Sequence, residues 1–201
     1  MTKPPERLLQ QMDFIIEADK LKNIFRQSFI SDKSRRENDA EHSWHLALMV
    51  IVLSEHANNE NLDLLKILKM VIIHDIVEID AGDTYIYDEA AKKSQADREA
   101  KAADRLFNIL PADQATSFRT TWDEFEEGLT PESKFARSLD RLHPMLLNYL
   151  AEGKSWEEHN INEGDIRRIN GKIADGSEDL WTYTEHLIEK SIQSGILNAS
   201  E

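Results

Sequence analysis

The stretch LDLLKILKMVIIHDIVEID at residues 62–80 decides the fold of this chain. Its apolar residues recur every three or four positions, which is the spacing of one helix face, and the stretch is too long for an ordinary strand despite its β-branched run. We therefore predict one helix over residues 62–80. The residues expected to face the core are Leu65, Leu68, Ile72 and Ile76.

Three acid–base side chains lie in the second half of this predicted helix. Because a helix turns by about 100° per residue, His74, Asp75 and Glu78 fall within one sector of its surface. That sector borders Val71 and Ile72, so part of the cluster should be shielded from water, where unpaired charge is costly. A metal ion is the simplest partner for such a group.

Further helices are predicted on both sides of this stretch. Their apolar spacing gives helices over about residues 5–20, 40–58, 90–110, 112–127, 131–150, 166–174 and 180–196. The polar segments 30–39 and 80–88 are predicted loops. With 7 Gly and 5 Pro in 201 residues, we expect an all-α fold. Residues 1–201 should form a single domain, a bundle of about seven to nine helices.

The composition narrows the class of function. A formal net charge of −14 argues against a general binder of long nucleic acids, because duplex affinity depends on Lys and Arg that neutralise phosphates. A small anionic substrate is compatible with this charge if a metal ion and a few arginines reverse the local potential. The sequence has no cysteine, which excludes disulfides, thiolate catalysis and Cys-based zinc sites.

The sequence does not have the pattern of a secretory signal or a membrane span. Residues 1–10 lack a charged-then-apolar signal pattern, and the longest apolar run, residues 46–53, is far too short to cross a bilayer. We therefore expect a cytoplasmic protein that has no membrane partner.

Two further candidate metal ligands lie outside residues 62–80. His42 stands one turn before Leu46 at the head of its predicted helix, so it should point inward. Asp140 lies at the edge of the apolar stripe of another helix. Together with His74 and Asp75 they supply two imidazoles and two carboxylates, which suit one hard-to-borderline divalent cation. Such a cation can polarise a phosphoryl oxygen and acidify a water molecule.

Three motifs, in this order, resemble a known family. They are EHSWH at residues 41–45, IHDIVEIDAGD at residues 73–83 and SLDR at residues 138–141. These motifs, within a matching region from about Asp19 to Tyr149, resemble the HD-domain metal-dependent phosphohydrolase superfamily. Within it, the chain is most similar to the small single-domain group that contains the 5′-deoxynucleotidases.

The resemblance implies an all-helical fold and a set of functional residues. It implies one divalent cation bound by His42, His74, Asp75 and Asp140. The cation would be manganese, cobalt, iron, nickel, zinc or magnesium, since a shell of two histidines and two aspartates accepts all of them. The resemblance also implies that Glu78 assists catalysis, that Asp83 lies at the same site, and that the chain forms a homodimer.

The chemistry of the two additional carboxylates agrees with these roles. A carboxylate one turn beyond a metal-binding histidine, as Glu78 is, can orient or deprotonate an attacking water. Asp83 follows Gly82 in a predicted loop. There it could protonate the leaving ribose oxygen or hold the water from the other side.

Two arginines, Arg26 and Arg35, are candidate ligands of the substrate phosphate. The segment from Lys22 to Arg26 resembles the basic segment that contacts the 5′-phosphate in the nucleotidase group, and Arg35 stands seven residues before His42, as a family arginine does. Gln27 departs from the pattern, because characterised deoxynucleotidases have a tryptophan there. The resemblance therefore does not decide between ribose and deoxyribose.

The other histidines are less informative. His45 shares the face of His42, and we interpret it as a core histidine, with a supporting role behind the metal ligands as the alternative. The remaining histidines are predicted to be surface or packing residues, and they are His56, His143, His159 and His186.

These observations together predict a metal-dependent phosphomonoesterase that releases phosphate from a nucleoside 5′-monophosphate. One alternative is hydrolysis of another phosphate bond, in a cyclic dinucleotide, a nucleoside triphosphate or an alarmone, although such sites usually need more basic groups and often a second metal ion. The other alternative is a regulator that binds metal and nucleotide without turnover. The presence of both Glu78 and Asp83 favours an enzyme.

Overall fold

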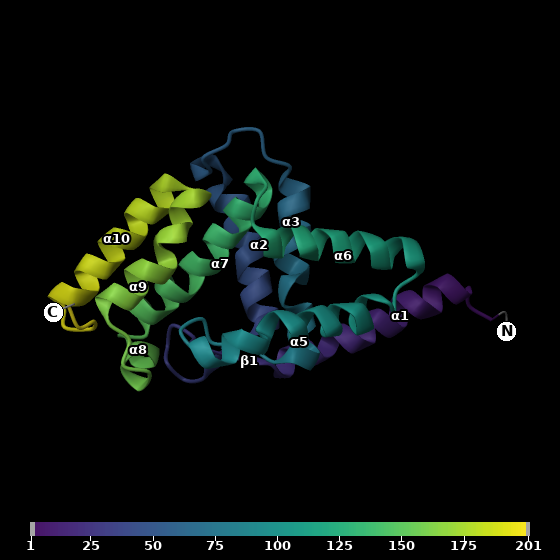
Figure 1. The fold of residues 1–201 in the computed structure, drawn as a ribbon, viewed down its shortest axis with the longest axis horizontal. Helices are drawn as coiled ribbons and strands as arrows, with labels where there is room; N and C mark the ends of the chain where they lie inside the picture. The colour runs from purple at the N-terminus through teal and green to yellow at the C-terminus, as the bar shows by residue number, and fades with distance from the viewer. Residues whose placement is uncertain (1–2, 200–201) are drawn as a thin grey trace.

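The computed structural model describes residues 3–199 and is mostly helical, as predicted (Figure 1). The helices are α1 (Glu6–Ala18), α2 (Asp39–Leu53), α3 (Leu64–Ile73), α4 (Glu78–Ala81), α5 (Glu89–Phe107), α6 (Ala112–Glu127), α7 (Pro131–Leu150), α8 (Lys154–Glu158), α9 (Glu163–Asn170) and α10 (Glu178–Gln193). Short 3-10 helices connect some of them, namely η1 (Asp19–Asn23), η2 (Ser54–His56), η3 (His74–Val77) and η4 (Gly171–Asp175).

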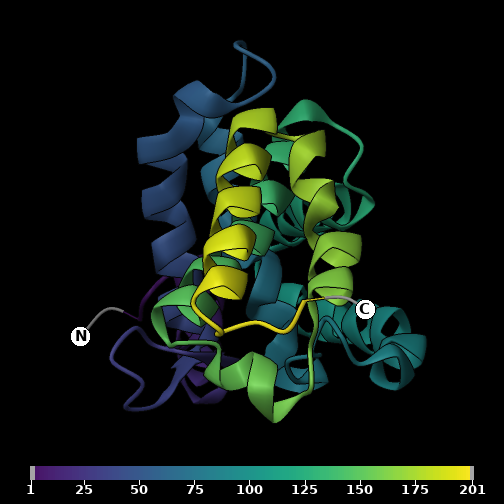
Figure 2. The same ribbon diagram turned by 90° about the vertical axis from the view of Figure 1, so that its left-hand side faces the viewer.

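Helices α2, α3 and α7 pack against one another at the centre of the molecule. Their contact buries a core cluster that includes Leu46, Val50, Met70, Phe135 and Leu139. A second cluster lies under α5 and α6, and a third lies among α7, α8, α9 and α10. Figure 1 shows α1, α5 and α6 extending to one side of this centre, and Figure 2 shows α9 and α10 covering the other.

Residues 62–80 fold as successive helical pieces rather than as the single predicted helix. α3 ends at Ile73, the 3-10 helix η3 carries His74 and Asp75, and α4 begins at Glu78. The Trp122 indole N–H donates to the His74 carbonyl oxygen at 3.2 Å, so this carbonyl is satisfied where the α-helix is interrupted. A 3-10 segment within a longer helix often marks a functional position, and here it holds two candidate ligands.

The buried face predicted for α3 is wrong at two positions. Leu65 is 62% exposed and Ile72 is 47% exposed, although Ile76 is buried as predicted. Ile67 and Met70 pack into the core instead. The reason is that α3 is apolar on two sides, and periodicity does not say which side meets the rest of the molecule.

A two-stranded hairpin occupies part of the segment predicted as a loop at residues 30–39. β1 (Phe25–Phe29) pairs antiparallel with β2 (Arg36–Asn38). The strand signal was weak because β2 is short and fully polar. Asn38 and Glu41 then form a capping box, in which each side chain accepts a hydrogen bond from the backbone N–H of the other residue. The hairpin therefore leads directly into the first turn of α2.

The predicted boundaries agree with the structure for α6 and α7. Pro111 precedes α6, and Thr130 caps α7 ahead of Pro131. The segments predicted at 166–174 and 180–196 correspond to α9 with η4 and to α10, whereas α8 was not predicted. Within residues 3–199, no helix combines the length and the apolarity that crossing a bilayer requires.

Candidate metal centre

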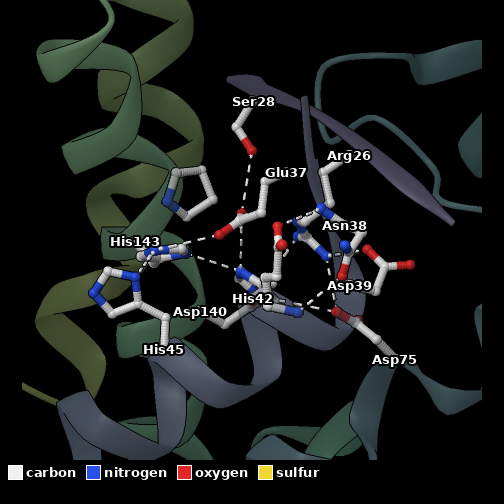
Figure 3. A network of polar contacts seen from close by, with 12 residues as sticks. Arg26, Ser28, Glu37, Asn38, Asp39, His42, His45, Asp75, Asp140 and His143 are labelled. Carbon is white, nitrogen blue, oxygen red and sulfur yellow. Dashed lines mark hydrogen bonds and ion pairs between the residues drawn. The ribbon is translucent and has the colours of Figure 1, made fainter. Parts of the chain in front are cut away.

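The four predicted ligands come together between α2, η3 and α7. Figure 3 shows three of them, His42, Asp75 and Asp140. His42 Nε2 lies 3.0 Å from Asp140 Oδ1 and 3.9 Å from Asp75 Oδ2. His74 Nε2 lies 3.0 Å from Asp75 Oδ1 and 3.6 Å from Asp140 Oδ1. His42, His74 and Asp75 are buried, and one ligand atom of each lies within 4.8 Å of the others. Side chains from three distant segments thus converge on one point.

His74 presents its Nε2 atom to this point. Its Nδ1 atom lies 3.0 Å from the Val71 carbonyl oxygen, and since a carbonyl only accepts, Nδ1 carries a proton and donates it. Nε2 is buried without a hydrogen-bond partner in the described part of the chain. Burial lowers the pKa of His74, but Asp75 and Asp140 outweigh burial and raise it above its usual value. This nitrogen therefore attracts positive charge, either a proton or a metal ion.

Three buried carboxylates, Asp39, Asp75 and Glu78, form what we call the carboxylate side of the centre. One oxygen of each lies within 4.8 Å of the others. Among the described residues, Asp39 Oδ2 and Glu78 Oε2 have no hydrogen-bond partner. Burial raises the pKa of Glu78 well above its usual value, and the charges of Asp75 and Asp39 raise it further. Burial and the charge of Asp75 raise the pKa of Asp39 to about 7. The carboxylate side is therefore short of positive charge.

Arg26, predicted as a phosphate ligand, contacts the carboxylate side from β1. Its NH1 atom lies 2.8 Å from Asp75 Oδ2 and 3.3 Å from Asp39 Oδ1. Its NH2 atom lies 3.9 Å from Asp140 Oδ1. One guanidinium thus faces several carboxylates, and its single charge cannot offset all of them.

Arg35, in contrast, does not reach the centre. Its guanidinium donates to both carboxylate oxygens of Glu41, at 2.8 and 2.7 Å, and its side chain is 48% exposed. The reason is that Arg35 lies in the turn between β1 and β2, which carries it outward. Lys22 forms an exposed ion pair with Asp19. Neither Arg35 nor Lys22 lines the cavities beside the centre.

Behind His42 lies a second group of polar side chains, which we call the histidine side, formed by Glu37, His45 and His143 (Figure 3). His42 Nδ1 lies 2.9 Å from His143 Nδ1, and His143 Nε2 lies 2.8 Å from His45 Nδ1. The Glu37 carboxylate lies 3.7 Å from His42 Nδ1 and 3.7 Å from His143 Nε2. The Ser28 hydroxyl donates to Glu37 at 3.5 Å. Each imidazole of this group therefore has a polar partner.

Sequence reasoning missed His143 and Glu37 as residues of the site. His143 is fully buried, and it stands three residues after Asp140, which places both side chains on adjacent positions of one helix face. That spacing was the available signal. Glu37 lies in β2, which was predicted as a loop, so its burial had no signal. His45 takes the supporting position that was the alternative interpretation, since it reaches His42 through His143.

A cavity of about 540 Å³ opens beside the centre. Its walls include His74, Asp75, Glu78, Asp83 and Asp140. Burial raises the pKa of Asp83. A smaller hollow of about 80 Å³ shares Arg26, Asp83 and Asp140 with the cavity, and adds Tyr85, Tyr87 and Trp156. Once a cation offsets the carboxylates of the centre, the arrangement can hold an anion there and a ring beside it.

Comparison with known sequences agrees with this geometry. A model of the HD domain matches residues 18–181. The 5′-deoxynucleotidase HDDC2 of Xenopus laevis is 26% identical over 140 residues, which cover 69% of this chain and 66% of that protein. The human 5′-deoxynucleotidase HDDC2 is 24% identical over 136 residues, which cover 67% of this chain and 65% of that protein. The chain thus spans slightly less than two thirds of the length of these curated relatives.

Comparison with solved structures agrees with the match to the HD domain. A crystal structure from Magnetospirillum magnetotacticum MS-1, described as a predicted metal-dependent phosphohydrolase, has a TM-score of 0.93 and 45% identity, and the match covers 98% of this chain and 100% of that chain. A conserved hypothetical protein from Pyrococcus furiosus has a TM-score of 0.61 and 24% identity, with 90% of this chain and 99% of that chain covered, and shows the fold alone.

Proposed function

This chain belongs to the HD-domain phosphohydrolases, and from this premise we propose that it releases phosphate from a nucleoside 5′-monophosphate. The observation that carries the proposal is the convergence of His42, His74, Asp75 and Asp140 beside a cavity. The similarity to 5′-deoxynucleotidases supports a nucleotide substrate. The aromatic hollow beside the centre offers stacking surfaces for a base.

In this proposal His42, His74, Asp75 and Asp140 hold one divalent cation. Two observations fit a cation: the buried His74 Nε2, which makes no hydrogen bond although Asp75 Oδ1 lies 3.0 Å away, and the shortage of positive charge on the carboxylate side. When bound, the cation polarises the phosphoryl group and lowers the pKa of water. The donor set accepts manganese, cobalt, iron, nickel, zinc or magnesium.

If His42 is a metal ligand, its role determines which nitrogen atoms of the histidine side carry protons. If His42 Nε2 gives its lone pair to a cation, Nδ1 carries the proton and donates it to His143 Nδ1. His143 Nε2 then carries the second proton of this chain and donates it to His45 Nδ1. Burial and the charge of His42 lower the pKa of His143 well below its usual value, which keeps it neutral as this arrangement requires.

The same reasoning opposes a second cation between Glu37, His45 and His143. Ligand atoms of these three residues lie within 4.8 Å of one another, which resembles a metal site. However, the proton on His143 Nε2 occupies the lone pair that such a site would need. We therefore propose that this group orients His42, as hydrogen-bond partners behind metal ligands commonly do.

Two carboxylates transfer the protons of the proposed reaction. Glu78 takes a proton from the attacking water, whose oxygen forms a bond to phosphorus as the bond from phosphorus to the 5′ oxygen breaks. Burial raises the pKa of Glu78, and a nearby cation would lower it again and leave an ionised base. Asp83, whose pKa burial raises, gives a proton to the departing 5′ oxygen. Arg26 binds the phosphate oxygens and balances their charge.

Phosphate release tests this function. Metal-stripped protein is reloaded with manganese, cobalt or magnesium and mixed with ribo- and deoxynucleoside 5′- and 3′-monophosphates, with Asp75→Ala run alongside. We expect release from 5′-monophosphates that disappears in the Asp75→Ala protein. No release from any nucleotide with any metal, from folded protein, would overturn the proposal.

We also propose that the chain forms a homodimer through an apolar face of α2 and α3. On α2 the exposed apolar side chains recur at helical spacing, at Trp44, Leu48, Ile51 and Val52. Leu65 and Ile72 of α3 are exposed as well. An apolar surface of this extent usually marks an interface. Light scattering should give twice the chain mass of 23.2 kDa, and Ile51→Glu should halve it; a wild-type mass of 23.2 kDa would contradict the dimer.

A further inference from the structure

Three positively charged side chains, whose charge is not fully offset by neighbouring carboxylates, line the cavity beside the metal centre. They are Arg137 and Arg141 of α7 and Lys172 of η4. The same three residues also line an adjoining hollow of about 100 Å³. The cavity as a whole is lined by as many carboxylates as Lys and Arg side chains, whereas the adjoining hollow is lined by these three cations and Lys134 against only Glu127 and Asp175. These three side chains therefore need a specific explanation.

Arg141 is the most informative of the three. Its side chain is partly buried, and NH1 donates to the Ile169 carbonyl oxygen at 3.2 Å. Among residues 3–199, no carboxylate oxygen lies within ion-pairing distance of its guanidinium. A partly desolvated guanidinium without an ionic partner is costly, and an anionic ligand in the cavity would supply that partner.

Arg137 lies one turn before Arg141 and is held in place by backbone groups. Its NH1 atom donates to the carbonyl oxygens of Phe125 and Glu126, at 3.0 and 3.1 Å. Gly128 also packs on its stem, because a Cβ at that position would lie 3.0 Å from Arg137 Cδ. The Glu126 carboxylate, at 3.6 Å, offsets part of its charge. Both guanidinium groups on this helix face thus donate to backbone carbonyl oxygens, and only Arg137 has an ion pair as well.

The other cations of the cavity differ in this respect. Arg168 pairs with Glu89 and Asp165, each at 3.6 Å, and Lys92 pairs with Glu89 at 3.5 Å. Arg26 pairs with Asp75 at 2.8 Å and belongs to the metal centre. The group formed by Arg137, Arg141 and Lys172 is therefore separate from the cation already assigned to the reacting phosphate.

We infer that Arg137, Arg141 and Lys172 form a second anion subsite, which binds a further phosphate group on the substrate. This inference rests on the proposed function, and it names the substrate class as a 5′-phosphorylated nucleoside that carries another phosphate. The 5′ phosphate is hydrolysed at the metal centre, and the other phosphate stays on the product. A cavity of about 540 Å³ has the volume of ordinary small-molecule sites, which exceeds the needs of one phosphate.

Steady-state kinetics with matched substrates test the subsite. A nucleoside 3′,5′-bisphosphate is compared with the corresponding 5′-monophosphate, and the 5′-diphosphate is the control, because breaking its bond to the 5′ oxygen would release both phosphates together. We expect kcat/KM to favour the 3′,5′-bisphosphate over the other two by about tenfold or more. Arg141→Gln and Lys172→Gln should each remove most of that preference while leaving the 5′-monophosphate nearly unaffected. Lys172 is exposed, so its variant should fold normally.

A binding measurement separates failure of the subsite from failure of the proposed function. Calorimetry with the nucleoside 3′-monophosphate, compared with the nucleoside, should show tighter binding of the phosphorylated compound in the wild type and not in Arg141→Gln. Arg119→Gln removes a charge that pairs with Asp123 outside the cavity and should change nothing. Equal kcat/KM for the 5′-monophosphate and the 3′,5′-bisphosphate, or equal losses for both in Arg141→Gln, would overturn the subsite while the phosphatase stands.

Discussion

The two sides of the metal centre are built from similar residue types but differ in how they are satisfied. On the histidine side, His45 and His143 each have a polar partner at 2.8 to 2.9 Å, and Glu37 lies 3.7 Å from both His143 and His42. On the carboxylate side, Asp39 Oδ2 and Glu78 Oε2 are buried without a hydrogen-bond partner among the described residues. Both sides contain buried ionisable groups.

This difference indicates that the two sides have different functions in the centre. A fully partnered group holds its neighbour in one orientation, and His42 is the neighbour of the histidine side. A group with unsatisfied buried carboxylates is costly on its own and becomes favourable when a cation or a water enters. We therefore interpret the histidine side as the group that orients His42, and the carboxylate side as the group that receives the cation or water.

The largest expected effect is that of Glu78→Gln on the receiving side. Loss of the proposed base should lower the rate of phosphate release by about 10²–10⁴-fold. The same change should raise the melting temperature of the metal-free protein, because it removes a buried carboxylate from a repulsive group. Initial rates and thermal melts in chelator measure both quantities. A Glu78→Gln variant that keeps its activity, or that is less stable than the wild type without metal, would contradict this distinction between the two sides.

The next effect is that of His143→Phe on the orienting side. Phenylalanine cannot accept the proposed hydrogen bond from His42 Nδ1, so the cation should bind about 10–100-fold more weakly. His143→Gln keeps a side-chain acceptor and should lose less. Cation affinity measured by calorimetry decides the matter, with melting curves as a control for folding. Wild-type affinity in His143→Phe would show that the histidine side does not orient the ligand.

A third prediction concerns Glu99, a buried carboxylate of the same cavity that lies on α5. Burial raises the pKa of Glu99 to about 7. The folded protein then keeps a proton that the unfolded chain releases near pH 4.5, so this residue's contribution to stability falls as pH rises from about 4.5 to about 7.

Glu99→Gln, in consequence, should stabilise the protein at pH 8, on the order of 2 kcal/mol, and have little effect at pH 4.5. Urea unfolding of both proteins at the two pH values measures this difference. A stability difference that does not change with pH would mean that Glu99 is not an uncompensated buried acid.

The smallest expected effect is that of Arg35→Ala, outside both sides. Its exposed ion pair with Glu41 should contribute less than about 1 kcal/mol, and the KM for a 5′-monophosphate should not change. Arg26→Ala is the matched comparison, since Arg26 contacts Asp75 and its loss should raise KM strongly. A large KM effect for Arg35→Ala would restore it as a phosphate ligand.

Many of the helices and ligand positions could be predicted from the sequence, because they depend on local patterns. The helical periodicity and the prolines placed α6 and α7. The helix position of His42 predicted an inward side chain, and Asp140 was placed at the edge of an apolar stripe. The resemblance of the motifs then indicated that they meet. Each of these signals lies within a few turns of one helix.

The features that the sequence did not predict depend on contacts between distant segments. The hairpin that brings Arg26 and Glu37 to the centre is short and polar, so its strands are defined by their pairing and not by their composition. The exposure of Leu65 and Ile72 depends on which side of α3 the other helices cover. The spacing of His143 from Asp140 was a local signal, but its contact with His42 depends on how α2 packs against α7.

Diffraction from crystals soaked in manganese, with data collected at the manganese absorption edge, tests the division of the centre most directly. The account predicts one strong anomalous peak within coordination distance of His42 Nε2, His74 Nε2, Asp75 and Asp140, and none among Glu37, His45 and His143. A peak among Glu37, His45 and His143, or no peak beside His74 and Asp75, would contradict it.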